Sequence, residues 1–248
     1  MSKYILPVSF ILFSLLCITA FSVKKETSIN KGFAVVELFT SEGCSSCPAA
    51  DEAVIDIAKQ YKEGVIILGF HVDYWNQLGW KDVFSKSEYS DRQKQYASAF
   101  SLNSIYTPQI VVNGKTEFVG SDKTKLQETI SKELNNNVAR TIELSARETN
   151  DGKIVVNVSS ANASNNNINI ALVQLQAQSN VAKGENEGKV LHHINIVRDL
   201  KIVDGNKKDN SVSFNFSAGL SKKDFEIVAF SQDKNNLHIT DARSVSIQ

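Results

Sequence analysis

Apolar residues in the first half of the chain follow two alternating patterns. Short β-branched and aromatic runs are typical of strands, and they occupy residues 33–40, 65–72, 109–113 and 115–119. Apolar residues repeated every three or four positions are typical of amphipathic helices, and they cover residues 49–61, 88–100 and 123–135. Asn113-Gly114, between the last two strand-like runs, is a strong signal for a tight hairpin. Together the patterns predict the element order β-α-β-α-β-β-α.

The second half of the chain differs in kind. Segments of alternating apolar and polar residues occupy positions 141–148, 153–160, 168–178, 190–203, 211–218, 225–233 and 238–247. Turn signals such as Asp151-Gly152 and Asn235-Asn236 separate them. Short strands at this spacing predict an all-β sandwich.

These two patterns predict two domains. The element order of the first half is that of the thioredoxin fold, in which a mixed central sheet carries helices on both faces. A chain of 248 residues also suits two domains, since one domain takes roughly 100 to 200 residues. With the asparagine run at 135–137 as the boundary, we expect an α/β thioredoxin-like fold over residues 32–136, followed by an all-β sandwich-like domain over residues 138–248.

The amino terminus has the pattern of a secretory signal. Lys3 precedes a run without charge from Ile5 to Phe21. Ala20 and Ser22 are a small-x-small pair, which predicts a signal peptide over residues 1–22 that is cleaved after Ser22, and therefore an exported protein, periplasmic or secreted. An uncleaved membrane anchor is the alternative, because the run is near the lower limit of about 17 residues for a membrane span. A lipidated Cys17 is disfavoured by the bulky residue before it.

Charge and composition exclude a different class of function. Lys and Arg together number 27, as do Asp and Glu, so the formal net charge is zero. A balanced chain has no uniform field that would attract nucleic acid, and we expect no nucleic-acid partner.

The two remaining cysteines carry the clearest chemistry. Cys44 and Cys47 form a C-x-x-C pair directly after a predicted strand and at the start of a predicted helix. The amino terminus of a helix stabilises a thiolate, so we expect Cys44 to be the more exposed, more acidic and attacking thiol, and Cys47 to resolve the mixed disulfide. An inert disulfide is the alternative. Structural zinc usually takes four ligands, which the mature chain lacks, so we expect neither a metal nor a cofactor.

Aromatic and ionisable residues follow the second predicted strand. His71, Asp73 and Trp75 would emerge at the same sheet edge as Cys44, where His71 and Asp73 could tune the thiols. His71 could shuttle a proton or join the thiolates in binding Cu(I), but it could also be a satisfied histidine at a strand end. Trp75 and Trp80 suit either packing or a substrate groove, and we expect the neighbouring Lys81 and Asp82 to form a solvated pair.

Long motifs resemble a known family. They are VVELFTSEGCSSCPAADE, FHVDYWNQLGWKDVFS, YTPQIVVNG and GENEGKVLHHINIVR, and they resemble the domain-of-unknown-function family of secreted thioredoxin-like proteins from bacteria. The resemblance implies a thioredoxin-like domain with a β-rich carboxy-terminal domain. Thioredoxin-fold oxidoreductases carry a cis-proline at this position that faces the disulfide, so we expect Thr107-Pro108 to be cis and, with Trp75, to bind substrate; a trans proline at the start of a strand is the alternative. We expect Gly184-Glu185-Asn186 to form a turn, and His192 or Arg198 to bond between domains.

The leading function is an exported thiol-disulfide oxidoreductase that acts on protein disulfides through Cys44 and Cys47. Its partners would be protein thiols or disulfides and a membrane or periplasmic redox protein. Two alternatives remain: a copper-binding or metal-delivery protein that uses the same cysteines with His71, and a non-catalytic thioredoxin-fold binding module.

Overall fold

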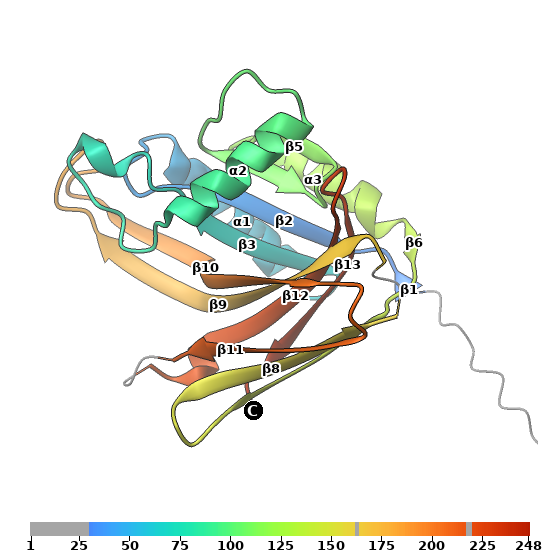
Figure 1. Ribbon diagram of the computed structural model, residues 1–248. Helices are drawn as coiled ribbons and strands as arrows, with labels where there is room; N and C mark the ends of the chain where they lie inside the picture. The colour runs from blue at the N-terminus through green and yellow to red at the C-terminus, as the bar shows by residue number, and fades with distance from the viewer. Residues whose placement is uncertain (1–29, 162–163, 217–219) are drawn as a thin grey trace, which may run out of the picture.

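The computed structural model describes residues 30–161, 164–216 and 220–248 (Figure 1). The predicted signal peptide, residues 1–22, lies outside these ranges. Within them, every helix is too short or too polar to cross a membrane.

One large mixed sheet runs through both halves of the chain (Figure 1). Its eight strands lie in the order β13-β12-β9-β10-β3-β2-β4-β5. Four come from the first half: β2 (Ala34–Thr40), β3 (Val65–His71), β4 (Gln109–Val112) and β5 (Thr116–Val119). The others are β9 (Asn166–Asn180), β10 (Val190–Asp204), β12 (Phe225–Asp233) and β13 (Ile239–Ser246). These bounds confirm the strands that the patterns predict.

The junction between the halves is the parallel pairing of β10 with β3. Ile196 of β10 lies opposite Gly69 of β3, while β3 pairs in parallel with β2 on its other side. Strands that the sequence assigns to a separate sandwich therefore extend the first sheet. The division into domains at residue 137 stays a prediction.

Helices cover both faces of the first half of the sheet. α2 (Ser87–Ala99) packs on the face that receives Val35 and Phe39 of β2. α1 (Cys47–Gln60) and α3 (Lys123–Leu134) pack on the opposite face, which receives Val36 and Leu38. This alternation along β2 is the period of a strand buried on both sides, which explains its continuous apolar sequence.

A second, three-stranded sheet packs against the carboxy-terminal half of the large one (Figure 1). It contains β7 (Ile142–Glu148), β8 (Lys153–Ser160) and β11 (Asp209–Asn215). Its inner side chains, such as Ile154 and Phe214, bury themselves on Ile170 and Ile227 of β9 and β12. The remaining elements are the short strands β1 (Asn30–Lys31) and β6 (Asn137–Val138) and the 3-10 turns η1 (Asn76–Leu78) and η2 (Lys222–Asp224).

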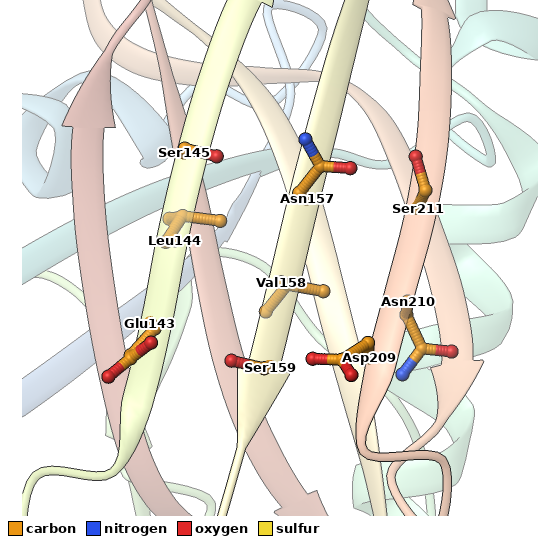
Figure 2. Close-up of a pocket in the computed structure, with 9 residues that line it drawn as sticks. All are labelled: Glu143, Leu144, Ser145, Asn157, Val158, Ser159, Asp209, Asn210 and Ser211. Carbon is orange, nitrogen blue, oxygen red and sulfur yellow. The ribbon is translucent and has the colours of Figure 1, made fainter.

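The outer face of that small sheet is polar. Figure 2 shows Ser145, Asn157 and Ser211 in one cross-strand row, and Glu143, Ser159 and Asp209 in the next. They line an open groove of about 470 Å³. No cysteine lines this groove, so the redox pair lies elsewhere.

A buried ion pair between α2 and β2 is hydrogen-bonded to the second half of the chain through Gln232. Arg92 donates to both carboxylate oxygens of Glu37, with Nε–Oε2 at 2.6 Å and Nη2–Oε1 at 2.9 Å. Gln232 of β12 accepts from Arg92 at 3.2 Å and donates to the Tyr96 hydroxyl at 2.8 Å. Burying two charges is tolerable here because each is paired and hydrogen-bonded.

Candidate active site at the Cys44–Cys47 disulfide

Cys44 and Cys47 form a disulfide at the amino terminus of α1. Their sulfurs are 2.22 Å apart and their Cα atoms 5.4 Å apart. Cys47 is the first residue of α1, and its amide donates to the carbonyl of Cys44 at 3.2 Å. Pro48 follows in the first turn, where the missing amide hydrogen breaks no helical bond. The redox pair therefore lies where the strand-to-helix pattern predicts it.

Neither sulfur-bearing side chain is accessible in this form. Cys44 and Cys47 are both 0% exposed, although Ser45 and Ser46 between them are exposed. In the disulfide form neither cysteine is more exposed than the other, and a more exposed and more acidic Cys44 thiol in the reduced protein stays a prediction. The loop that carries Cys44 also makes a contact with the other half of the chain, which the local helix pattern does not contain.

That contact comes from the hairpin between β9 and β10. Asn186 is 0% exposed, and its side-chain amide donates to the carbonyls of Glu42 and Cys44, both at 2.9 Å. Glu185 accepts from the Ser45 amide at 3.0 Å, and hydrogen bonds from Ser45 hold the pKa of Glu185 below its ordinary value. The segment Gly184-Glu185-Asn186 is thus a turn, as expected. It is bonded to residues 41–47, which connect β2 to α1 and are called the cysteine loop below.

A buried pair of ionisable groups lies beside the same loop. Nδ1 of His71 is 2.6 Å from Oδ2 of Asp82, and the same carboxylate accepts from the Glu42 amide at 2.9 Å. Burial opposes ionisation of Asp82, but the charge and hydrogen bond of His71 outweigh it and hold the pKa of Asp82 below its ordinary value. The expected solvated Lys81–Asp82 pair is wrong. Lys81 is exposed, whereas Asp82 is buried. Its carboxylate can be buried because it is hydrogen-bonded to His71 and to the Glu42 and Phe84 amides.

His193 of β10 completes the buried cluster. Its Nδ1 is 3.5 Å from Asp51 of α1, and its Nε2 is 3.7 Å from Glu42. Its ring lies edge-on to the His71 ring at a centroid distance of 4.8 Å. Burial lowers the pKa of His193, but the hydrogen bond to Asp51 and the charges of the nearby Asp51 and Glu42 outweigh that effect and raise it to about 9. The cysteine loop is therefore backed by a cationic imidazole between two carboxylates.

Trp75 and Thr107 meet next to the cysteine loop. The Trp75 indole donates to the Thr107 hydroxyl at 2.8 Å. A Cβ placed on Gly43 would lie only 3.1 Å from the Cβ of Trp75, so the tryptophan packs directly against the residue before Cys44. The Thr107–Pro108 peptide bond is cis. Trp75 therefore connects Thr107 to the residue before Cys44.

The two predicted tuning residues have different surroundings. His71 is 1% exposed and belongs to the buried cluster. Asp73 instead accepts a 2.5 Å hydrogen bond from Ser90 of α2, so its carboxylate is directed to that helix. Trp80 donates to Glu42 at 2.7 Å, which makes it a packing partner of the cluster.

Sequence reasoning did not single out several residues of this site. They are Glu42, Asp51 and His193, whereas Asn186 was expected only as part of a turn and not as a partner of the cysteine loop. Asp51 offered a signal, because it lies one turn after Cys47 on the apolar face of α1, where a carboxylate needs a partner. Over the described ranges, no group of three or more His, Cys, Asp or Glu side chains is arranged to hold a metal ion.

Comparison with known proteins identifies the family. The sequence profile described as "Protein of unknown function (DUF1223)" matches residues 35–232. The chain belongs to this family. A 100-residue part of this DUF1223 protein, 40% of the chain, is 32% identical to thioredoxin from Methanocaldococcus jannaschii and spans 94% of that protein. The thioredoxin similarity and the Cys44–Cys47 pair together support a thiol-oxidoreductase-like role.

Solved structures give a further comparison. A crystal structure of a protein from Agrobacterium tumefaciens is 27% identical and superposes with a TM-score of 0.66, covering 86% of this chain and 93% of the other. A domain of the outer membrane lipoprotein Omp28 from Porphyromonas gingivalis is 19% identical, with a TM-score of 0.28 over 43% of this chain and 94% of the other.

Proposed function

We propose that this DUF1223 protein is an exported thiol-disulfide oxidoreductase that acts on protein disulfides through Cys44 and Cys47. The observation that carries the proposal is a disulfide at the amino terminus of α1, in a chain of which 100 residues are 32% identical to a thioredoxin. The secretory pattern over residues 1–22 supports export, since exported proteins keep or exchange disulfides that the cytosol would reduce.

The reaction follows from the positions of the two sulfurs. In the reduced protein, the Cys44 thiolate attacks one sulfur of a substrate disulfide, and the other substrate sulfur leaves as a thiolate that takes up a proton. Cys47 then loses its proton and attacks the Cys44 sulfur, which releases the second substrate thiol. The substrate disulfide gains two electrons, and the dithiol becomes the Cys44–Cys47 disulfide. The same steps in reverse oxidise a substrate dithiol.

Substrate binding is assigned to Thr107, Pro108 and Trp75. The Trp75–Thr107 hydrogen bond and the packing of Trp75 on Gly43 support this assignment, because they bring an aromatic surface and a strand entrance to the redox pair. The partners are proteins that carry thiols or disulfides, and a membrane or periplasmic redox protein restores the dithiol or the disulfide.

The test is reduction of insulin by dithiothreitol in the presence of the mature protein. Wild type should accelerate the reaction, and Cys44→Ser and Cys47→Ser should each abolish the acceleration. Cys47→Ser should also accumulate a mixed disulfide through Cys44, because the resolving thiol is missing. Wild-type protein with a titratable dithiol but no acceleration would refute the proposal in favour of a binding module.

A further inference from the structure

Residues 181–189, the turn between β9 and β10, lie on the cysteine loop. We propose that this turn is a cover that controls which reagents reach Cys44, and that Asn186 is the latch that holds it closed. Asn186 is then a specificity-determining residue, and the inference rests on the proposed function only in the choice of substrates.

The latch is one buried amide that makes three hydrogen bonds. Nδ2 of Asn186 donates to the carbonyls of Glu42 and Cys44, and its Oδ1 accepts from Lys189 at 2.9 Å. An asparagine amide has two donor hydrogens and one acceptor oxygen, and here all have partners. Glu185 and Glu187 on either side are exposed, whereas Asn186 between them is buried. Asn186 therefore binds two particular carbonyls of the cysteine loop through buried hydrogen bonds.

The cover is a preformed turn. Within it, the Val181 amide donates to Lys189 at 3.0 Å and the Gly188 amide donates to Val181 at 2.8 Å. Gly184 and Gly188 have φ values of +81° and +79°, which the left-handed bends of this turn require. A Cβ on Gly184 would lie 3.4 Å from the Cβ of Trp80, so the turn sits between the cysteine loop and the segment around η1. Figure 1 shows this end of β9 and β10 beside that segment.

A second hydrogen bond connects the turn to the residue after Cys44. The Glu185 carboxylate accepts from the Ser45 amide at 3.0 Å. Together, Asn186 and Glu185 therefore hold the backbone on both sides of Cys44, which itself has no exposed surface.

This burial controls reactivity because disulfide exchange requires direct attack on a sulfur atom. With Cys44 at 0% exposure, a reductant reacts only with the fraction of molecules in which the cover is open. A small thiol makes too few contacts to open the cover itself, whereas a protein substrate that binds beside Trp75 can displace the turn. Breaking the latch should therefore favour small reagents over protein substrates.

The test measures reduction of the protein's own disulfide by dithiothreitol and by glutathione. Asn186→Ala removes the latch, and Asn186→Asp keeps its shape but replaces the donors with acceptors that face two carbonyls. Each should raise the rate at least about tenfold, the scale expected for losing two buried hydrogen bonds. Glu185→Gln, at an exposed position where folding is safe, should raise the rate less. Glu187→Gln is the matched control, since it removes the same charge from the same turn.

Urea unfolding of the oxidised variants identifies any that fail to fold. Unchanged reduction rates in folded Asn186→Ala, or equal effects of Glu185→Gln and Glu187→Gln, would overturn the proposal. The ratio of activity on a small aromatic disulfide to activity on insulin should rise in Asn186→Ala, whereas a merely structural role would lower both together. The rates on the protein's own disulfide remain measurable if insulin reduction fails, so the two proposals are tested separately.

Discussion

Replacement of His193 by glutamine should remove most of the loss of stability that the wild-type protein shows as the pH rises from 6 to 10. His193 is 2% exposed and lies between Asp51 and Glu42, which raise its pKa from 6.5 to about 9. The folded protein therefore holds this proton more tightly than the unfolded chain. The resulting stabilisation is fully present below pH 6.5, and it is lost as the pH rises through about 9.

The magnitude follows from the two pKa values. One pKa unit corresponds to about 1.4 kcal/mol, so the difference between 6.5 and about 9 gives an upper estimate of about 3 kcal/mol. His193→Gln retains a polar side chain of similar size but cannot carry the charge. The difference in unfolding free energy between wild type and variant should fall by about 3 kcal/mol between pH 6 and pH 10.

Urea unfolding of the oxidised protein at a series of pH values measures this difference. Other titrating groups act equally in both proteins, so the subtraction removes them. His192→Gln is the matched control, because His192 is the exposed neighbour on β10 and should leave the pH profile unchanged. A wild-type-minus-variant difference that is constant or rises with pH would refute the assignment of a buried cation beside the cysteine loop.

Three further variants test the fold and the metal-binding alternative. Arg92→Met should destabilise the oxidised protein by roughly 3 to 5 kcal/mol in urea unfolding, because it leaves the buried carboxylate of Glu37 without its cation; a loss below 1 kcal/mol would contradict this. Gly114→Ala should cost roughly 2 kcal/mol in the same assay, since its φ is +63° and its Cβ would come within 2.0 Å of the Leu237 carbonyl; a neutral change would show that the hairpin adapts freely. The reduced protein should retain little copper after dialysis against a competing chelator, because Nδ1 of His71 is bound to a carboxylate; stoichiometric copper that is lost in His71→Ala would support metal delivery instead.

The amino-acid sequence by itself determined the elements and the position of the redox chemistry. The β-branched and aromatic run of β2 and the period of three to four in α1 are local, and so are the turn signals that separate the strands of the second half. The C-x-x-C pair at the strand-to-helix junction is also readable from neighbours in the chain.

Only the tertiary structure decided what surrounds that chemistry. Asn186 bonds to the Glu42 carbonyl across 144 positions of sequence, and no local pattern reports which buried carbonyls remain to be satisfied. The same holds for Asp82, which looks like a solvated neighbour of Lys81 until the fold places His71 against it. The pairing of β10 with β3 brings His193 and the β9–β10 turn to the cysteines, because an open sheet edge accepts any strand of suitable register. Local periodicity specifies which face of a strand is buried, but not which other strand pairs with its edge.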